Sequence, residues 1–319
     1  MEKKETVKKF SSSSTALEVT EGVDLNGKTV LVTGCTSGIG TETARTLALR
    51  NAHVVMANRN QEQSMKLRDR IRAEMPNANI DLLELDLSSL KSVKKAAEEF
   101  LAKDWKLHIL ILNAGVFSPS VKKTVDGFEM AFGVNHLGHF YLTYLLLDRL
   151  RQSSPSRVVV VTSVTHKHSG VNPKASTDEK VHRLIEPALS QVSYRLYACS
   201  KLCNILMAMK LHRDELKNDI RVYSVHPGTL ISTGISRTYG WPGRLFYRIT
   251  QPFCKTLQQG AATTVYCATS KDVLESSGKY FADCCDDEKS LAKSLVYDEA
   301  LQDALWKKSL ELVKNSMQY

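Results

Sequence analysis

The sequence predicts an α/β protein with a single doubly wound parallel β-sheet flanked by helices. Short runs rich in Val, Ile and Leu alternate with longer amphipathic stretches through most of the chain. These runs are apolar throughout instead of alternating with polar residues, which is typical of parallel strands covered on both faces. Gly, Asn or Ser follows the end of most of them, at the edge where α/β sheets bind ligands.

Six strands follow from this pattern, and a helix connects each strand to the next. The predicted strands are residues 28–34, 53–60, 80–87, 107–115, 156–163 and 220–228. The predicted helices between them are residues 41–52, 61–75, 90–103, 127–150 and 193–204. Crossovers between such parallel strands are almost always right-handed, so one continuous sheet is expected.

The composition is that of a globular protein, with 43% hydrophobic and 24% charged residues. The net charge is +9, but the 43 basic and 34 acidic residues are interspersed, without the basic stripe and interleaved aromatics of a nucleic-acid-binding surface. We therefore expect no nucleic acid partner, and a basic surface that attracts phosphorylated cofactors or anionic membranes. The first 23 residues are polar, serine-rich and aperiodic, which predicts a flexible tail.

The seven cysteines form no CxxC pair and no Cys/His cluster at zinc spacing, so we expect reduced thiols and no metal site. No apolar run approaches the roughly 20 residues that a membrane-spanning helix needs. The amino terminus lacks the apolar core of a secretory signal, and its glutamates argue against a transit peptide. These features predict a cytoplasmic protein, with peripheral membrane contact as an alternative.

A glycine-rich turn connects the first strand to the first helix. The stretch "VLVTGCTSGIGTETA" places Gly34, Gly38 and Gly40 in the pattern G-x-x-x-G-x-G. Glycines let the backbone turn tightly and approach a pyrophosphate, which binds at the positive end of the following helix. A turn without a ligand is the alternative, but the strand before it and the helix after it favour a dinucleotide cofactor. The other residues of the predicted phosphate loop are Thr36, Ser37 and Ile39.

The residues at the end of the second strand indicate which nicotinamide cofactor binds. Many NAD enzymes carry an acidic residue here for the ribose 2′-hydroxyl. This chain instead reads "VVMANRN", with Asn58 and Arg59 and no carboxylate before Glu62. A guanidinium suits a 2′-phosphate by its charge and its forked donors, so the sequence favours NADP, with NAD as the alternative. An Arg59 that is merely solvated would leave the choice open.

Further motifs stand at the carboxyl ends of successive strands. They are Asp86-Leu87, Asn113-Ala114-Gly115, Thr162-Ser163 and Pro227-Gly228, with Tyr197 and Lys201 in the helix between the last two. In this order, TG-x-x-x-G-x-G, NAG, Ser, Y-x-x-x-K and PG resemble the short-chain dehydrogenase/reductase family from about residue 26 to at least Gly228. Each motif is weak alone, but the ordered set is specific.

Several longer stretches resemble the retinol-dehydrogenase-like branch of that family. They are "VNHLGHFYLT", "YACSKLCNIL", "VHPG", "QQGAATTVYCA" and "YFADCC". Within the branch they are most similar to members whose dehydrogenase domain follows WW modules. No tryptophan-paired WW module precedes the domain here, so partners of such modules are not expected. The resemblance implies a Rossmann-type domain over residues 24–319, with a cofactor part at about 24–165 and a catalytic and substrate part, including a small C-terminal substrate lid, at about 166–319.

The resemblance implies that Tyr197 is the acid/base, which protonates a carbonyl oxygen or deprotonates an alcohol. A free phenol has a pKa near 10, and an ammonium one helical turn away lowers it. Lys201 occupies that position, whereas Tyr194 has no lysine one turn on. The family pattern has Ser163 orient the carbonyl and stabilise the developing oxyanion. In the same pattern, Asn135 holds a water molecule for proton relay. Alternatively, Asn135 is a polar residue that bends an otherwise apolar helix.

The resemblance also implies cofactor contacts along the same edge of the sheet. Apart from the glycine loop, these are Asn58, Arg59, Asp86, Leu87, Asn113, Ala114, Gly115, Tyr197, Lys201, Pro227, Gly228 and Ser232. Residues 165–193 are polar and contain Pro173 and Pro187, which predicts a loop over the site with His166 and His168 in solvent.

In this family the segment after Gly228 closes over the substrate. Here it is rich in large apolar side chains: Trp241, Leu245, Phe246, Tyr247, Ile249 and Phe253. An apolar flap predicts a lipophilic small-molecule substrate, an alcohol or carbonyl such as a retinoid, a steroid or a long-chain aldehyde. The basic residues among them are also typical of a segment that rests on a membrane, and core packing is a further alternative. The apolar stretch "LCNILMAMKL" is expected either to pack in a homodimer interface, as in family members, or to lie in the interior of the domain.

These features together predict an NADP-dependent oxidoreductase that transfers hydride between the nicotinamide and a lipophilic alcohol/carbonyl pair. The second hypothesis is a regulatory or scaffold protein that senses the cofactor and has weak catalysis. The complete set of Ser163, Tyr197 and Lys201 favours the enzyme, because a scaffold has no physical need for it.

Overall fold

A computed structural model describes residues 9–117, 119, 121–186, 192–228 and 255–318 of the protein. These residues form one eight-stranded sheet in the order β3-β2-β1-β4-β5-β6-β7-β8, parallel except between β7 and β8. The strands are β1 (Thr29–Thr33), β2 (His53–Asn58), β3 (Ile80–Glu84), β4 (Ile109–Leu112), β5 (Ser156–Val161), β6 (Ile220–His226), β7 (Tyr280–Ala282) and β8 (Cys285–Asp286). The predicted α/β class and all six predicted strands are confirmed, and β7 and β8 extend the sheet.

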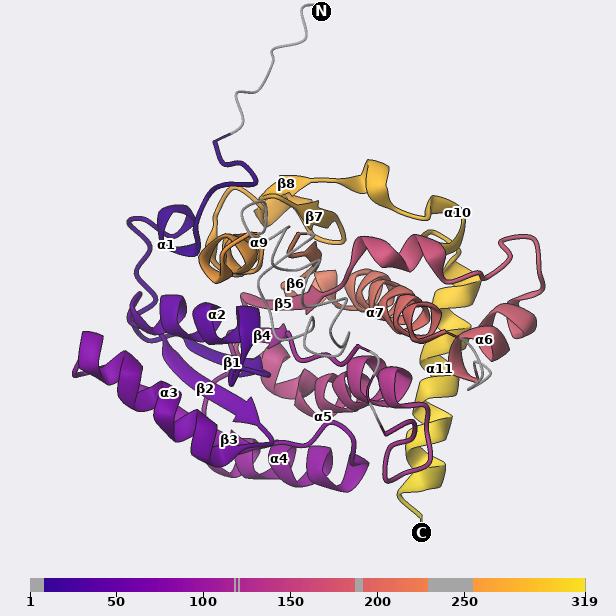
Figure 1. The fold of residues 1–319 in the computed structure, drawn as a ribbon, viewed down its shortest axis with the longest axis horizontal. Coiled ribbons are helices and arrows are strands. Elements are labelled where there is room, and N and C mark those ends of the chain that lie inside the picture. The colour runs from indigo at the N-terminus through magenta and orange to yellow at the C-terminus, as the bar shows by residue number, and fades with distance from the viewer. Residues whose placement is uncertain (1–8, 118, 120, 187–191, 229–254, 319) are drawn as a thin grey trace, which may run out of the picture.

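Helices cover both faces of the sheet, so that each face has its own apolar core (Figure 1). One face carries α1 (Ala16–Val19), α2 (Gly38–Ala48), α3 (Gln61–Glu74) and α9 (Leu257–Thr269). The other carries α4 (Leu90–Ala102), α5 (Gly138–Gln152), α6 (Thr177–Ile185), α7 (Ser193–Glu215), α10 (Lys293–Val296) and α11 (Glu299–Ser316). Shorter turns are the π-helical η1 (Phe132–Leu137) and the 3-10 turns η2 (Val164–His168), η3 (Leu216–Asn218), η6 (Leu274–Ser276) and η7 (Glu288–Ser290). Strands β1 and β4 at the centre of the sheet are buried along their whole length, because neither face meets water.

Capping side chains explain where the helices beside the glycine loop begin. Asn60 precedes α3, and its side-chain oxygen accepts a hydrogen bond from the backbone amide of Gln63 at 2.9 Å. Thr256 precedes α9 and forms a capping box with Gln259. The start of α9 is therefore set by its own sequence, directly after the segment of residues 229–254.

Residues 9–23 do not form the flexible tail that their composition predicts. Thr15 and Glu18 form a capping box that starts α1, which packs against α9. Ala16 and Val19 on this helix are buried, with exposed fractions of 0% and 5%. A single helical turn with two inward side chains is too short to give a periodic sequence signal, which is why the composition hides the packing.

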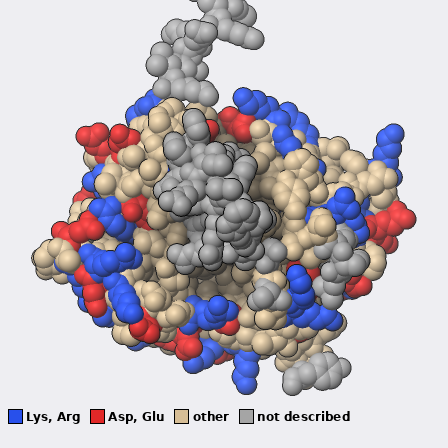
Figure 2. Space-filling model, viewed as in Figure 1, with Lys and Arg blue, Asp and Glu red and all other residues tan. Residues whose placement is uncertain are grey.

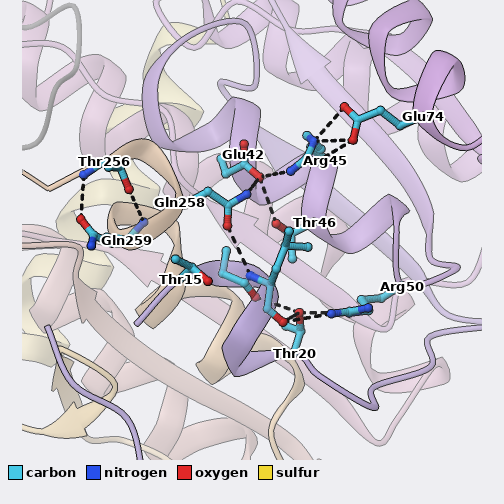
Figure 3. A network of polar contacts seen from close by, with 12 residues as sticks. Thr15, Thr20, Glu42, Arg45, Thr46, Arg50, Glu74, Thr256, Gln258 and Gln259 are labelled. Atoms are coloured by element: carbon cyan, nitrogen blue, oxygen red, sulfur yellow. Dashed lines mark hydrogen bonds and ion pairs between the residues drawn. The ribbon is translucent and has the colours of Figure 1, made fainter. Parts of the chain in front are cut away.

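Hydrogen bonds tie this amino-terminal segment to α2 and α9 (Figure 3). The Arg50 side chain, just beyond α2, donates to the backbone carbonyl of Leu17 at 2.9 Å. The Gln258 side chain in α9 accepts from the Leu17 backbone amide at 3.4 Å and donates to the Glu42 carboxylate in α2. The segment is therefore a cross-link between the helix that follows the glycine loop and the helix that follows residues 229–254.

The carboxyl-terminal helix α11 packs against α7 and α6 (Figure 1). Most of the stretch "LCNILMAMKL", residues 202–211, is buried within the chain. The interior alternative for this stretch is therefore correct. A homodimer built on this part of α7 would have to displace α11.

The surface of the described residues mixes charges of both signs. On the face in Figure 2, basic and acidic side chains alternate around the rim, and uncharged residues occupy much of the remaining surface. No helix in the described part of the chain is long and apolar enough to cross a membrane.

Removing residues 1–20 should destabilise the fold, because it uncovers the part of α9 that α1 covers. Burial of Val19 alone is worth about 1.5–3 kcal/mol, so the midpoint of urea unfolding should fall. The matched control removes residues 1–8 and leaves the cross-link intact. Equal midpoints for the two truncations would show that residues 9–20 contribute no stability.

Candidate active site

Gly34, Gly38 and Gly40 form a compact turn between β1 and α2, with no room for a side chain at Gly34 or Gly40. Gly34 and Gly38 have φ angles of +72° and +61°, in the left-handed region that favours glycine. A Cβ atom on Gly40 would lie 2.1 Å from the Gly34 carbonyl oxygen and 2.5 Å from Asn113 Nδ2. The Ser37 side chain makes no capping bond, so α2 begins with backbone N–H groups that the helix does not use. This cradle fits a pyrophosphate.

Asn113 holds the glycine loop against the end of β4. Its side-chain nitrogen donates to the carbonyls of Thr33 at 2.9 Å and Gly34 at 3.0 Å. The backbone amides of Asn113 and Ala114 both donate to the Thr33 hydroxyl at 3.0 Å. A Cβ atom on Gly34 would lie only 2.7 Å from the Ala114 Cα. Asn113 and Ala114, predicted as cofactor contacts, therefore also shape the cradle itself.

The two predicted contacts at the end of β2 lie in different environments. Asn58 is 3% exposed, and its side chain accepts from the Cys35 backbone amide at 2.5 Å and donates to the Ser64 hydroxyl at 2.9 Å. Its side chain therefore supports the glycine loop. Arg59 is exposed, and it makes no hydrogen bond or ion pair with any residue that the structure describes.

Ser163, Tyr197 and Lys201 come together at the carboxyl edge of the sheet. Ser163 follows β5, and its side chain lies close enough to Tyr197 to lower the pKa of the phenol, while its hydroxyl accepts from the Thr165 backbone amide at 3.3 Å. Lys201 lies one turn further along α7, with its Nζ 5.4 Å from the centroid of the tyrosine ring. The same Nζ donates to the Val161 carbonyl at 2.9 Å. The last residue of β5 thus holds the lysine beside the tyrosine.

Burial sets the protonation states of this group. It raises the pKa of Tyr197 to about 12, and the nearby Ser163 side chain opposes that rise. Burial also lowers the pKa of Lys201 to about 8. The direction for Tyr197 is opposite to the expected lowering, because desolvation of the phenolate outweighs the opposing effect of the Ser163 side chain. At neutral pH Tyr197 is therefore a protonated phenol, the state that can donate a proton.

Asn135 lies in η1, a π-helical turn that replaces the first part of the predicted continuous helix 127–150. Its side chain accepts from the Val116 backbone amide at 2.7 Å and donates to the Val116 carbonyl at 3.0 Å and the Ser200 hydroxyl at 2.9 Å. These bonds fix the turn after β4 to α7. A Cβ atom on Gly115 would lie 3.4 Å from Asn135 Oδ1 and 3.5 Å from Lys201 Nζ, so both side chains approach the same backbone.

His139 connects Asn135 to the glycine loop. Its Nδ1 donates to the Asn135 carbonyl at 3.0 Å, because a carbonyl can only accept. Its Nε2 therefore accepts from the Thr33 hydroxyl at 2.9 Å. Burial lowers the pKa of His139 to about 4, so the ring is neutral, as these bonds require.

The connection between β5 and α7 differs from the predicted loop. It contains η2 and α6, and α6 packs against α11 and α7. A capping box of Ser176 and Glu179 starts α6, and its apolar side chains are too few to stand out in a polar stretch. Pro187 lies outside the described residues.

The two histidines of η2 have opposite environments. The prediction that His166 is solvated is wrong, because its exposed fraction is 0% and both ring nitrogens have backbone partners. His168 is exposed, as expected, and its Nδ1 lies 2.7 Å from the Tyr194 hydroxyl. Tyr194 thus packs against the connection between β5 and α7, away from the Ser163 hydroxyl.

The remaining predicted cofactor contacts lie after β3 and β6: Asp86, Leu87, Pro227 and Gly228. The Asp86 carboxylate accepts from the backbone amide and the hydroxyl of Ser88 at 2.9 and 2.7 Å, so it shapes the turn after β3. Gly228 has a φ angle of +115°, and a Cβ atom there would lie 2.8 Å from Lys255 Cδ. Ser232 and the apolar residues of the predicted flap lie outside the described residues.

Two residues near Tyr197 were missed from the sequence. The Phe117 ring packs edge-to-face on the Tyr197 ring, with centroids 5.1 Å apart. The Ser200 hydroxyl accepts from Asn135 and donates to the Tyr197 carbonyl at 2.8 Å. Ser200 lies inside the Y-x-x-x-K motif and Phe117 two residues beyond NAG, so their closeness to motifs was the available signal.

Comparison with known proteins agrees with this geometry. The family described as short chain dehydrogenase matches residues 28–175. The WW domain-containing oxidoreductase of Gallus gallus is 42% identical over 313 residues, which are 98% of this chain and 74% of that protein. The chain belongs to the short-chain dehydrogenase family. Retinol dehydrogenase 12 of Mus musculus is 40% identical over 294 residues, 92% of this chain and 89% of that protein. The expected similarity to both kinds of relative is confirmed.

A solved structure supports the same fold. A crystal structure described as a putative uncharacterized protein from Mycobacterium Paratuberculosis has a TM-score of 0.70 and 28% identity, covering 93% of this chain and 97% of that one. Membership of the short-chain dehydrogenase family makes the protein an oxidoreductase of a family that binds NAD or NADP.

Gly40→Ala should disrupt the phosphate cradle, because the new methyl group would overlap a backbone carbonyl and the Asn113 amide. We expect cofactor affinity to fall about ten-fold or more, since the loop must open to admit the methyl group. Titration with NADPH, followed by its fluorescence, measures this loss. Gly27→Ala is the control, because a Cβ atom there would have nothing within 4 Å. The positive φ of Gly27 adds a cost to folding of about 1–2 kcal/mol in that variant. Equal NADPH affinities for the two variants would contradict the assignment.

Proposed function

We propose that the protein is an NADP-preferring oxidoreductase that reduces a lipophilic carbonyl compound, with Tyr197 as the proton donor. The observation that carries the proposal is the meeting of Ser163, Tyr197 and Lys201 beside a glycine cradle that fits a pyrophosphate. Oxidation of the corresponding alcohol is the reverse reaction of the same residues.

Each residue of the site has a distinct task in this proposal. When bound, the nicotinamide cofactor supplies the hydride. Tyr197 gives its hydroxyl proton to the carbonyl oxygen of the substrate. The Ser163 hydroxyl orients that oxygen and stabilises the negative charge that develops on it. The Lys201 ammonium stabilises the phenolate that remains when the proton has left.

The reductive direction is supported by the protonation state of Tyr197. Because burial raises its pKa to about 12, the phenol holds its proton throughout the neutral range. Carbonyl reduction uses that proton, whereas alcohol oxidation has to begin from the phenolate. The resting protonation state of Tyr197 is therefore the one that carbonyl reduction uses.

Asn135 has a positioning role in the proposal. Its side chain fixes the turn after Gly115 to α7, close to Lys201. A water molecule that returns a proton to Tyr197 would bind beside these residues, as the family resemblance implies for Asn135.

The preference for NADP rests on Arg59. This residue follows β2, where α/β dinucleotide sites hold the adenosine ribose. It is exposed, it has no partner among the described residues, and its charge suits a 2′-phosphate. The nearby Asn58 side chain is already used by the glycine loop, so Arg59 is the available cation at the strand end.

A lipophilic substrate is supported by three features. Residues 241–253 are rich in aromatic and aliphatic side chains. The Phe117 ring lies against Tyr197 and gives the proton donor an apolar neighbour. The chain is also similar to retinol dehydrogenase 12 over most of its length. Retinoids, steroids and long-chain aldehydes are the candidates with this chemistry.

Tyr197→Phe should remove the proton donor and keep the ring that contacts Phe117. We expect NADPH-dependent reduction of a retinoid or long-chain aldehyde to fall by about 10²–10⁴-fold, the usual contribution of a general acid. NADPH binding should stay within a few-fold of wild type. Tyr194→Phe is the matched control, since it removes a hydroxyl one turn earlier that contacts His168.

Full turnover by Tyr197→Phe would refute the mechanism. If the wild-type protein binds NADPH tightly and reduces no member of a panel of retinoids, steroids and aldehydes, the result would favour the regulatory, cofactor-sensing alternative.

Arg59→Asp should shift the cofactor preference toward NADH, because a carboxylate repels the 2′-phosphate and accepts from a 2′-hydroxyl. We expect the ratio of kcat/KM for NADPH to that for NADH to fall about ten-fold or more, the loss of one charge-assisted hydrogen bond. Arg70→Asp on α3 is the control with the same change in net charge, also at an exposed arginine. An unchanged ratio in Arg59→Asp would remove Arg59 from the cofactor site.

A further inference from the structure

His166 lies fully buried directly behind the end of β5. Its Nδ1 lies 2.8 Å and its backbone nitrogen 3.1 Å from the Ser163 carbonyl oxygen. On the other side of the ring, Nε2 lies 3.1 Å from the backbone nitrogen of Ala292. The ring therefore spans from Ser163 to the segment between η7 and α10.

These two contacts fix the protonation of the ring. The Ser163 carbonyl can only accept, so Nδ1 carries the hydrogen. The Ala292 amide can only donate, so Nε2 keeps its lone pair. His166 is therefore the neutral Nδ1–H tautomer, and a proton on Nε2 would break the bond to Ala292. Burial lowers the pKa of His166, which agrees with a neutral ring.

The segment that His166 reaches is itself anchored. The Asp287 backbone amide donates to the Tyr280 carbonyl in β7 at 2.8 Å. The Tyr297 hydroxyl donates to the Glu288 carboxylate at 2.7 Å. The Tyr280 ring also faces His166, with centroids 5.6 Å apart. A fixed support therefore stands behind the imidazole.

We propose that His166 is a positioning residue for the Ser163–Tyr197 pair, and that it acts by tying the Ser163 backbone to the segment before α10. The extended conformation of the Ser163 backbone, with φ of −157° and ψ of 148°, sets the direction in which its side chain leaves the end of β5, beside Tyr197. Two hydrogen bonds from His166 to the Ser163 carbonyl hold that conformation, and one of them comes from the ring. This inference rests on the proposed function of the pair.

Three substitutions separate the two links of the ring. The amide nitrogen of His166→Asn takes the place of Nδ1 and can donate to Ser163, but the side chain is too short to reach Ala292. The amide oxygen of His166→Gln takes the place of Nε2 and can accept from Ala292, but the donor to Ser163 is lost. His166→Leu removes both links and keeps an apolar side chain. His182→Asn, at an exposed histidine of α6, is the control.

We expect kcat for carbonyl reduction to fall about ten-fold or more in His166→Leu, because the Ser163 donor is misplaced. His166→Asn should recover most of that loss, and His166→Gln should recover less. The KM for NADPH should stay within about two-fold, since His166 does not contact the glycine loop. Wild-type kcat in His166→Leu, or no recovery in His166→Asn, would overturn the proposal.

Two NMR measurements test the proposal without turnover. In the wild-type protein, imidazole ¹⁵N shifts should show the Nδ1–H tautomer, and an Nε2–H tautomer would overturn the inference. The ¹³Cζ shift of Tyr197 should move in His166→Leu and return toward wild type in His166→Asn, and no movement would also overturn it. If the wild-type protein reduces no carbonyl, the proposed function fails, while these shifts still decide whether His166 positions the pair. If His166→Leu folds poorly, the same NMR shifts can still be measured in His166→Asn and His166→Gln.

Discussion

Close packing between backbone atoms at the turn from β1 to α2 is the constraint on which the site depends. Gly34 lies against Ala114, and Gly40 lies against the Gly34 carbonyl oxygen, so neither position has room for a methyl group. Asn113 then bonds to the carbonyls of both Thr33 and Gly34. These contacts fix the phosphate cradle to the end of β4, and the turn after β4 is in turn fixed to α7. The cofactor cradle and the proton donor are therefore connected by close backbone contacts and by the side chains of Asn113 and Asn135.

A buried hydrogen-bond chain links the glycine loop to the backbone of the proton donor. It runs from the Thr33 hydroxyl through the ring of His139 to the Asn135 carbonyl, and from the Asn135 side chain through Ser200 to the Tyr197 carbonyl. Leaving one buried donor or acceptor unpaired costs about 1–3 kcal/mol. Because each member of the chain has a partner with a fixed role, the arrangement resists small displacements of any one of them.

The sequence was informative where the signal is local. Continuous apolar runs located six strands, and the order of the motifs placed Ser163, Tyr197 and Lys201 at one edge of the sheet, where the structure also has them. Strands β7 and β8 have three and two residues, too few to show a period. His166 looked solvated because it lies in a polar run, and its partner Ala292 is 126 residues away. The raised pKa of Tyr197 comes from desolvation by the surrounding fold, which residue spacing does not encode.

The cross-link between residues 9–23, α2 and α9 also constrains the order in which the chain folds. Gln258 contacts Glu42 across 216 residues and Leu17 across 241 residues. During synthesis from the amino terminus, the sides of α1 and α2 that face α9 stay uncovered until α9 has been made. Contacts of such long range are also slow to form. A nascent chain therefore presents this apolar surface to chaperones, or to other nascent chains, until α9 has emerged.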